Sequence, residues 1–322
     1  MFGQQTSSDG GKKMTFASLL GILFAALSQA AVLALVTLGI VLIFRTSFTT
    51  NFAQGMIGTI TVYFTTMLHA FYITQKMTSL TAFQSIVLAI IAGIILGFFI
   101  GLFIDLVLIR QSRFSNPLSK QMITMGLVLI ITGLIPTIYA DVIDNPPTPR
   151  LLTRERTIVE LQSGNLVLSH HNLLTILIAV VVISLIFILL KYTKWGLGVR
   201  ATASNEKVAG MVGVNTRFIT AMSWGIAAGI GALAAALYAP TVQTLSVGLM
   251  VFMQVNGFLA AVLGGFSTFF GPIVGAIIIP ILTVFLYGFT DVWNVALVYM
   301  AILLVVLIKP VGIFGKKIAK KV

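Results

Sequence analysis

Charged side chains are scarce in this sequence: Lys, Arg, Asp and Glu make up only 9% of its 322 residues. A soluble domain carries about 25% charged residues, because these are the side chains that cover a surface facing water. Hydrophobic residues account for 58% of the chain, and the mean hydropathy is +1.07. Water therefore cannot be the main solvent of this protein, and we expect its apolar residues to face lipid.

Cysteine is absent altogether, which excludes a disulfide framework, a thiolate metal site and a cysteine nucleophile. No Gly-x-x-x-x-Gly-Lys-Ser/Thr phosphate loop occurs, so the chain lacks this motif for binding ATP. His170 and His171 are adjacent but have no constellation of metal ligands or a nucleophile around them. The sequence thus predicts no enzymatic activity, no cofactor and no metal site.

Acidic residues are the rarer charge, with 8 Asp and Glu against 20 Lys and Arg, which gives a formal net charge of +12. In a soluble protein this excess would suggest nucleic-acid binding. Here the basic residues fall almost wholly between apolar runs, where they set membrane orientation and meet anionic lipid headgroups. We therefore expect membrane lipid as a partner and no nucleic acid.

Long apolar runs follow one another along the chain, most of them near the roughly 20 residues that one membrane-spanning helix needs. They lie at residues 15–44, 52–73, 84–109, 121–140, 172–191, 218–239, 250–266, 271–289 and 292–308. The first run is too long for the hydrophobic part of a signal peptide, so it reads as a retained span. The pattern predicts an all-α, polytopic transmembrane helix bundle of about nine passes, with eight or ten as alternatives. Residues 1–14 then form a polar N-terminal tail and residues 15–322 a single transmembrane domain.

Basic residues predict the orientation of this bundle. They cluster in the gaps 110–120 and 191–217 and in the C-terminal tail, all of which should be cytoplasmic by the positive-inside rule. These three segments share one side of the membrane only if the glycine-interrupted stretch 250–289 crosses twice. This assignment places the N-terminus outside, the C-terminus in the cytoplasm and the large loop 141–171 outside.

The cytoplasmic stretch 194–215 predicts a short helix held at the membrane surface. Ser204 can cap this helix, and Glu206 in its first turn suits the helix dipole. Glycines flank the helix on both sides, namely Gly196 and Gly198, which permit a turn before it, and Gly210 and Gly213, which end it. Asn215 can then cap the next membrane span.

The apolar side of this short helix carries Val208 and Met211. A compact helix with an exposed apolar side can seat in a groove on a partner protein. An ordinary basic loop bound to lipid headgroups is the alternative, and composition alone does not decide between the two.

Four segments containing glycine stand out along the chain. They are Gly39-Ile-Val-Leu-Ile-Phe with Asn51-Phe-Ala-Gln-Gly-Met, the run Thr193–Asn215, Val262-Leu-Gly-Gly-Phe-Ser-Thr-Phe-Phe-Gly-Pro-Ile-Val-Gly, and Lys309-Pro-Val-Gly-Ile-Phe-Gly. In type and order these segments resemble the motifs of branched-chain amino acid ABC transporter permeases. The family often has His and Glu where this chain has Gln54 and Met56.

The resemblance implies a permease subunit of an ATP-binding-cassette importer, a multi-pass protein of the bacterial plasma membrane that moves branched-chain amino acids or similar small solutes. Its implied partners are two cytoplasmic ATPase subunits, a second permease subunit, homologous or identical, and an extracytoplasmic solute-binding protein. Coupling to the ATPase is implied for the loop 193–217, at Gly198, Arg200, Asn205, Glu206, Lys207, Gly210 and Gly213. Which solute is carried stays open.

Uncharged polar side chains in otherwise apolar runs are the candidates for contact with a solute. They are Gln29, Asn51, Gln54, Gln254 and Asn256. Burying an amide in lipid without a partner costs several kcal/mol, so these groups should point into the bundle. Hydrogen bonds between helices are the alternative role for each of them. Around Asn51, an unwound helix entrance and a plain helix cap are both open.

A self-contained secondary carrier or channel for small amphipathic solutes is the alternative function. The apolar runs hold few ionisable groups of the kind that proton or sodium relays use, which favours a power source outside this chain. Asp105 stands near the end of its run and close to Arg110, so we expect a charge at the cytoplasmic end rather than a relay.

Overall fold

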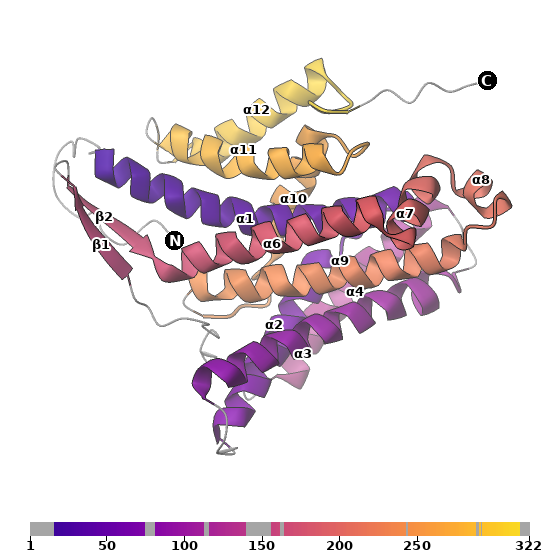
Figure 1. Cartoon of the computed structure of the whole chain (residues 1–322), viewed down its shortest axis with the longest axis horizontal. Coiled ribbons are helices and arrows are strands. Elements are labelled where there is room, and N and C mark those ends of the chain that lie inside the picture. Colours follow the sequence, from indigo (N-terminus) through magenta and orange to yellow (C-terminus); the bar gives the residue numbers. More distant parts are fainter. Residues whose placement is uncertain are drawn as a thin grey trace.

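The computed structural model of the chain describes residues 16–74, 81–112, 116–139, 156–161, 164–242, 244–287, 290 and 292–315. The long helices are α1 (Phe16–Ser47), α2 (Gln54–Thr74), α3 (Ala82–Phe103), α4 (Pro117–Ile138), α6 (His170–Tyr192), α9 (Thr216–Tyr238), α10 (Val251–Gly264), α11 (Phe270–Tyr287) and α12 (Asn294–Ile308) (Figure 1). Each of the nine predicted apolar runs overlaps one of them over most of its length, so the helical bundle is confirmed. The predicted tail 1–14 lies outside the described residues.

Shorter elements complete the described chain. They are the π-helical segment Ile104–Ile109, which continues α3, the helices α7 (Lys194–Ser204) and α8 (Glu206–Met211), and a 3-10 turn at Ala239–Thr241. Both α7 and α8 lie in the predicted cytoplasmic loop, between α6 and α9. The loop therefore contains two helices, where a turn followed by one short helix was predicted.

Six helices among the described residues are long and apolar enough to cross a membrane, judged by length and composition. They are α1, α3 with its π-helical extension, α4, α6, α9 and α11. Two more apolar helices are shorter, with 14 residues in α10 and 15 in α12. The chain thus has the helices of a multi-pass membrane protein, while nine passes stays a prediction.

A β-hairpin lies in the loop 141–171, which is predicted to be external. Strands β1 (Arg156–Leu161) and β2 (Gly164–Ser169) pair antiparallel, from Arg156 opposite Ser169 to Leu161 opposite Gly164. Residues 157–159 of β1 are the β-branched Thr, Ile and Val, which favour an extended backbone. Figure 1 shows this hairpin at the opposite end of the bundle from α7 and α8.

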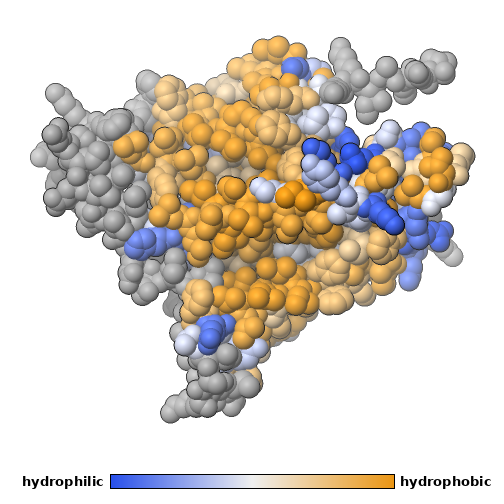
Figure 2. All heavy atoms as spheres, in the orientation of Figure 1, coloured by the Kyte–Doolittle hydropathy of each residue, from blue (hydrophilic) through white to orange (hydrophobic). Residues whose placement is uncertain are grey.

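The centre of the bundle is formed by α1 and α9, the two most buried of the membrane-length helices. Leu35 and Leu38 of α1 and Trp224 of α9 are fully enclosed. In contrast, few residues of α4 and α6 are buried, and Figure 2 shows a broad apolar band across the visible face of the molecule. The buried pair therefore forms a core on which the other helices pack.

Small residues at 225–236 of α9 predict a face for close helix packing, and the structure confirms it. A Cβ atom placed on Gly97 of α3 would lie 3.0 Å from the carbonyl oxygen of Ala228. A Cβ atom on Gly101 would overlap the carbonyl oxygen of Trp224. Glycine at these two positions lets the backbones of α3 and α9 approach each other closely.

We predict that Gly101→Ala destabilises the protein, because the added methyl group meets backbone that cannot turn away. Overpacking of this kind costs about 1–3 kcal/mol. The matched control is Gly133→Ala in α4, where an added Cβ meets nothing within 4 Å. Thermal unfolding of the purified proteins in one detergent should show a clear loss for the first variant and almost none for the second. Equal melting temperatures would contradict the close approach.

Candidate functional site

The connection between α1 and α2 turns back into the bundle. Phe48, directly after α1, has a φ of 51°, the one positive value outside glycine in the described part of the chain. The chain then runs back along α1, because Gln54 at the start of α2 lies beside Gly39: a Cβ atom on Gly39 would be 2.9 Å from Nε2 of Gln54. Helix α2 therefore begins inside the bundle rather than at its end.

Helix α10 begins beside the same place. A Cβ atom on Gly55 in the first turn of α2 would lie 3.0 Å from the carbonyl oxygen of Met250, the residue before α10. Ala227, near the middle of α9, borders both Gly39 and Gln54. Helices that start within a membrane bundle are a feature of transporters, in which they surround the solute site.

Three amide side chains join these broken elements in one hydrogen-bond network. Gln54 Nε2 donates to the carbonyl oxygen of Ala227 at 2.6 Å, and Asn51 Nδ2 donates to Oε1 of Gln54 at 3.1 Å. Gln254 Nε2 donates to the carbonyl oxygen of Asn51 at 3.0 Å, while its Oε1 accepts the N–H of Gly55. The backbone groups freed by the break thus find partners inside the protein.

This network gathers three of the five predicted pathway residues. Asn51, Gln54 and Gln254 come from sequence positions far apart and are 0%, 1% and 8% exposed. Asn51 has features of both an unwound helix entrance and a helix cap. The chain is not helical there, and Oδ1 of Asn51 accepts the N–H of Ala53 at 3.0 Å. In this conformation all three amides form hydrogen bonds to protein atoms. Such bonding between helices was the alternative to contact with a solute.

The other two predicted residues, Gln29 and Asn256, line a small pocket instead. The pocket has a volume of about 30 Å³, room for about one water molecule, and lies between α1, α10, α11 and α12. The hydroxyl of Tyr299 donates to Oδ1 of Asn256 at 3.3 Å, and Thr283 adds a second hydroxyl to the lining. Neither hydroxyl was predicted, although each is a polar group in an apolar run.

Helix α7 corrects the prediction of a turn at Gly196 and Gly198. Both residues are buried within the helix. A Cβ atom on Gly196 would overlap the carbonyl oxygens of Leu189 and Leu190, and one on Gly198 would lie 2.5 Å from Cδ1 of Ile219. The glycines are therefore needed because α7 folds back tightly on α6 and packs on α9.

Helix α8 begins one residue later than predicted. Ser204 ends α7, and Asn205 is the cap: its Oδ1 accepts the N–H of Val208 at 3.2 Å. Glu206 stands in the first turn, as predicted. Gly213, with a φ of +87°, ends this segment as predicted, whereas Gly210 lies within α8 and does not end it. The predicted cap of the next helix is also confirmed, because Oδ1 of Asn215 accepts the N–H of Phe218 at 3.1 Å.

Three apolar side chains at α8 are exposed beside the charged and equally exposed Glu206 and Lys207. Val208, Met211 and Val212 are 52%, 84% and 73% exposed, while Ala209 is buried against the rest of the chain. A Cβ atom on Gly210 would meet nothing within 4 Å. The helix thus presents a small apolar surface next to open space.

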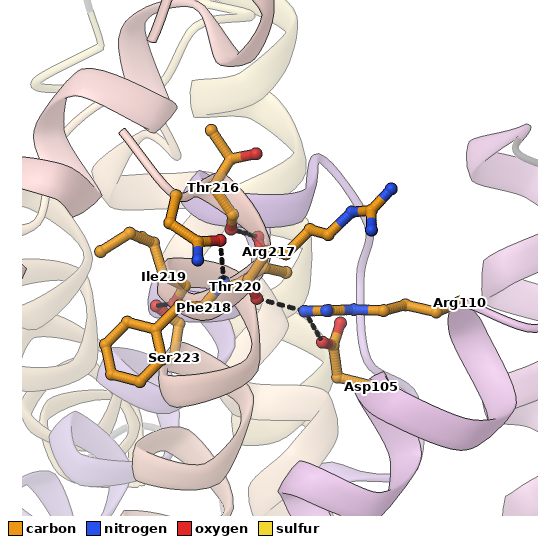
Figure 3. A network of polar contacts seen from close by, with 9 residues as sticks. Asp105, Arg110, Thr216, Arg217, Phe218, Ile219, Thr220 and Ser223 are labelled. Carbon is orange, nitrogen blue, oxygen red and sulfur yellow. Dashed lines mark hydrogen bonds and ion pairs between the residues drawn. The ribbon is translucent and has the colours of Figure 1, made fainter. Parts of the chain in front are cut away.

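Arg110 pairs with Asp105 at the end of the π-helical segment that continues α3, and a hydrogen bond from the same guanidinium links this end to the start of α9 (Figure 3). Nη2 of Arg110 lies 2.6 Å from Oδ2 of Asp105, whose side chain is 2% exposed, and also donates to the carbonyl oxygen of Arg217. The N–H of Arg110 bonds to the carbonyl oxygen of Asp105 at 3.1 Å, which is the spacing of a π-helix and brings residues five apart onto one face. We call this arrangement the Arg110 clasp.

The predicted ATPase-coupling residues all lie on or beside the two short helices. Gly198 and Arg200 belong to α7, Asn205 caps α8, and the rest follow within or just after it: Glu206, Lys207, Gly210 and Gly213. All except Gly198 are exposed. The Arg110 clasp was not predicted, because Arg110 and Arg217 are far apart in the sequence.

Long apolar helices, two helices that start inside the bundle, and a short helical pair at one end define a multi-pass membrane protein of transporter architecture. The profile of the family described as "Branched-chain amino acid transport system / permease component" matches residues 22–307. The match covers most of the chain, and the protein belongs to this family.

Two bacterial permeases are similar to part of the chain. The branched-chain amino acid permease BraD of Pseudomonas aeruginosa is 26% identical over 175 residues, which are 54% of this chain and 57% of BraD. LivH of Escherichia coli K12 is 31% identical over 138 residues, 42% of this chain and 44% of LivH. The match thus spans about half the length of these relatives. No solved structure matches the chain significantly.

We predict that Arg110→Ala destabilises the protein more than removal of both charges. The single change leaves the Asp105 carboxylate buried without its partner, and an unpaired buried charge costs more than the pair contributes. The double variant Asp105→Asn/Arg110→Gln removes that charge and should recover at least half of the loss in melting temperature. A double variant less stable than Arg110→Ala would contradict this account.

Proposed function

We propose that the chain is the transmembrane permease subunit of an ATP-binding-cassette importer in a bacterial plasma membrane. It would carry branched-chain amino acids or similar small solutes, powered by separate cytoplasmic ATPase subunits. A second permease subunit and an extracytoplasmic solute-binding protein would complete the complex. Family membership supports this proposal, and the names of BraD and LivH favour this class of solute.

The single observation that carries the proposal is the exposed apolar side of α8. Val208, Met211 and Val212 lie in a segment rich in basic residues, where solvated polar side chains are expected. Leaving such side chains in water is unfavourable, and an apolar helix face of this kind suits a groove on a partner protein. We assign that groove to the ATPase.

Three attachments would carry a push on α8 into the membrane part. Helix α7 packs through Gly196 and Gly198 on α6 and α9, Asn215 caps α9 directly after α8, and the Arg110 clasp ties the start of α9 to α3. Since α9 is one of the two central helices, its displacement would move the start of α2, which lies against it, and through Gln254 the start of α10.

The amide network is the proposed gate in this cycle. Its hydrogen bonds close the centre of the bundle in the described conformation. An amino-acid solute can exchange hydrogen bonds with Asn51, Gln54 and Gln254 when the ATPase pulls the broken helices apart. Affinity would come from the external binding protein, so the membrane part can release its solute.

Orientation and pass count belong to the same proposal. Nine passes with the N-terminus outside put α7 and α8 in the cytoplasm and the β-hairpin outside, and these elements lie at opposite ends of the bundle (Figure 1). The basic turn at Lys309 packs at the end of α10, where the N–H of Ile313 bonds to the carbonyl oxygen of Leu263 at 2.8 Å.

We predict that Met211→Asp abolishes uptake and weakens the ATPase complex about 10- to 100-fold, the factor expected for losing one buried apolar anchor. Gly210→Phe should act similarly by blocking the groove, without disturbing the chain itself, because its side chain enters open space. The measurements are solute uptake by cells and co-purification of the cognate ATPase, with the amount of inserted permease as reference.

The matched control is Val292→Asp, since Val292 is 83% exposed and is expected at the external end. This variant should keep uptake and ATPase binding. Normal uptake in Met211→Asp and Gly210→Phe would refute the contact. Solute transport by the purified chain alone in liposomes would instead favour a self-contained carrier or channel.

A further inference from the structure

A stripe of basic residues marks the corner between α6 and α7. Lys191, Lys194 and Arg200 are all exposed, and Leu197 lies between them at the same helical spacing. The opposite face of α7 is buried, with Val199 fully enclosed. One face of α7 therefore packs on the bundle, and the other exposes two cations and one leucine.

Two of these cations, Lys191 and Arg200, have contacts at the end of α6. Nη2 of Arg200 lies 3.4 Å from the carbonyl oxygen of Lys191, and Nζ of Lys191 lies 5.0 Å from the centre of the Tyr192 ring. Within the ranges that the structure describes, Lys191, Lys194 and Arg200 form no ion pair with a carboxylate. The positive charge of the corner is thus not neutralised by the described residues.

Helix electrostatics do not account for all three cations. Lys191 in the last turn of α6 suits the negative end of the helix dipole. Lys194, however, is the first residue of α7, where the dipole disfavours a positive charge. An anion held between the three side chains would remove this conflict.

An apolar stripe on α6 leads directly to these cations. Exposed side chains follow one another on one side of the helix for most of its length, namely Leu177, Val181, Leu185, Ile188 and Tyr192. In a membrane helix such a surface faces hydrocarbon. Figure 2 shows the hydrophilic residues of the α7 end immediately beside the apolar surface. The ligand that fits both parts has an anionic head and a hydrocarbon tail.

We infer that the corner between α6 and α7 binds an anionic phospholipid. Lys191, Lys194 and Arg200 hold the phosphate headgroup, and the acyl chains lie along the exposed stripe of α6. An acidic protein surface would match the cations but not the apolar stripe at membrane depth. The bound lipid fixes α7 at the membrane surface and so supports the position of α8; this consequence for coupling rests on the proposed function, whereas the binding itself does not.

The test titrates the purified full chain in detergent with phosphatidylglycerol or with phosphatidylcholine of identical acyl chains, and counts bound lipid by native mass spectrometry. No ATP or ATPase is present, so failure of the proposed function cannot affect the result. We expect phosphatidylglycerol to bind at least tenfold more tightly. Each basic residue near a headgroup contributes about fivefold, so Lys191→Gln/Lys194→Gln/Arg200→Gln should lose about 100-fold.

A matched triple variant, Lys120→Gln/Lys207→Gln/Lys309→Gln, removes the same charge from the same end of the molecule and should lose less than fivefold. Lys194→Gln alone, at an exposed position, tests the site with about a fivefold loss if the triple variant does not fold. Equal affinity for the two lipids, or equal losses in both triple variants, would overturn the inference. So would unchanged lipid affinity in the corner variant with weakened ATPase co-purification, because the stripe would then contact protein.

Discussion

The structure depends on one constraint: in hydrocarbon, each backbone N–H and carbonyl group must find its partner within the protein. Helices meet this demand along most of the chain. Where α1 gives way to α2 inside the bundle, the amides of Asn51, Gln54 and Gln254 meet it instead. Close packing of α9 against its neighbours through small residues makes room for this break. A bundle with such a break can have two packings, because the same amides can bond to each other or to a solute.

The cytoplasmic end has two faces that meet different surroundings. Helix α7 presents Lys194 and Arg200 beside the apolar stripe of α6, whereas α8 presents Met211 to open space. Helix α7 is tied to α9 by the packing of Gly198, and α8 is followed by Asn215, which caps α9; the Arg110 clasp holds the start of α9 to the end of α3. A lipid bound at α7 and an ATPase bound at α8 would therefore both act on α9.

Apolar run length was sufficient to predict the helices, because about 20 residues of one character allow few other structures. Local capping was also readable at Glu206, Gly213 and Asn215, since the partner atoms are a few residues away. Gly198 was misread as a turn residue, because glycine serves both turns and close packing, and its partner is on α9. Three of the candidate amides meet in one network, and their role toward a solute stays a prediction. The hydrogen bond between Gly55 and Gln254 depends on tertiary contact, which no local pattern encodes.

The proposed function depends on α8 facing the cytoplasm and binding the ATPase subunit there. Because the chain contains no cysteine, Met211→Cys would provide a single reporter at the most exposed apolar side chain of α8. The direct measurement is the labelling of this cysteine by a membrane-impermeant maleimide in intact cells and in inside-out vesicles. The account predicts labelling in the vesicles alone, suppressed when the ATPase is bound. Labelling from outside intact cells would contradict the orientation and the coupling together.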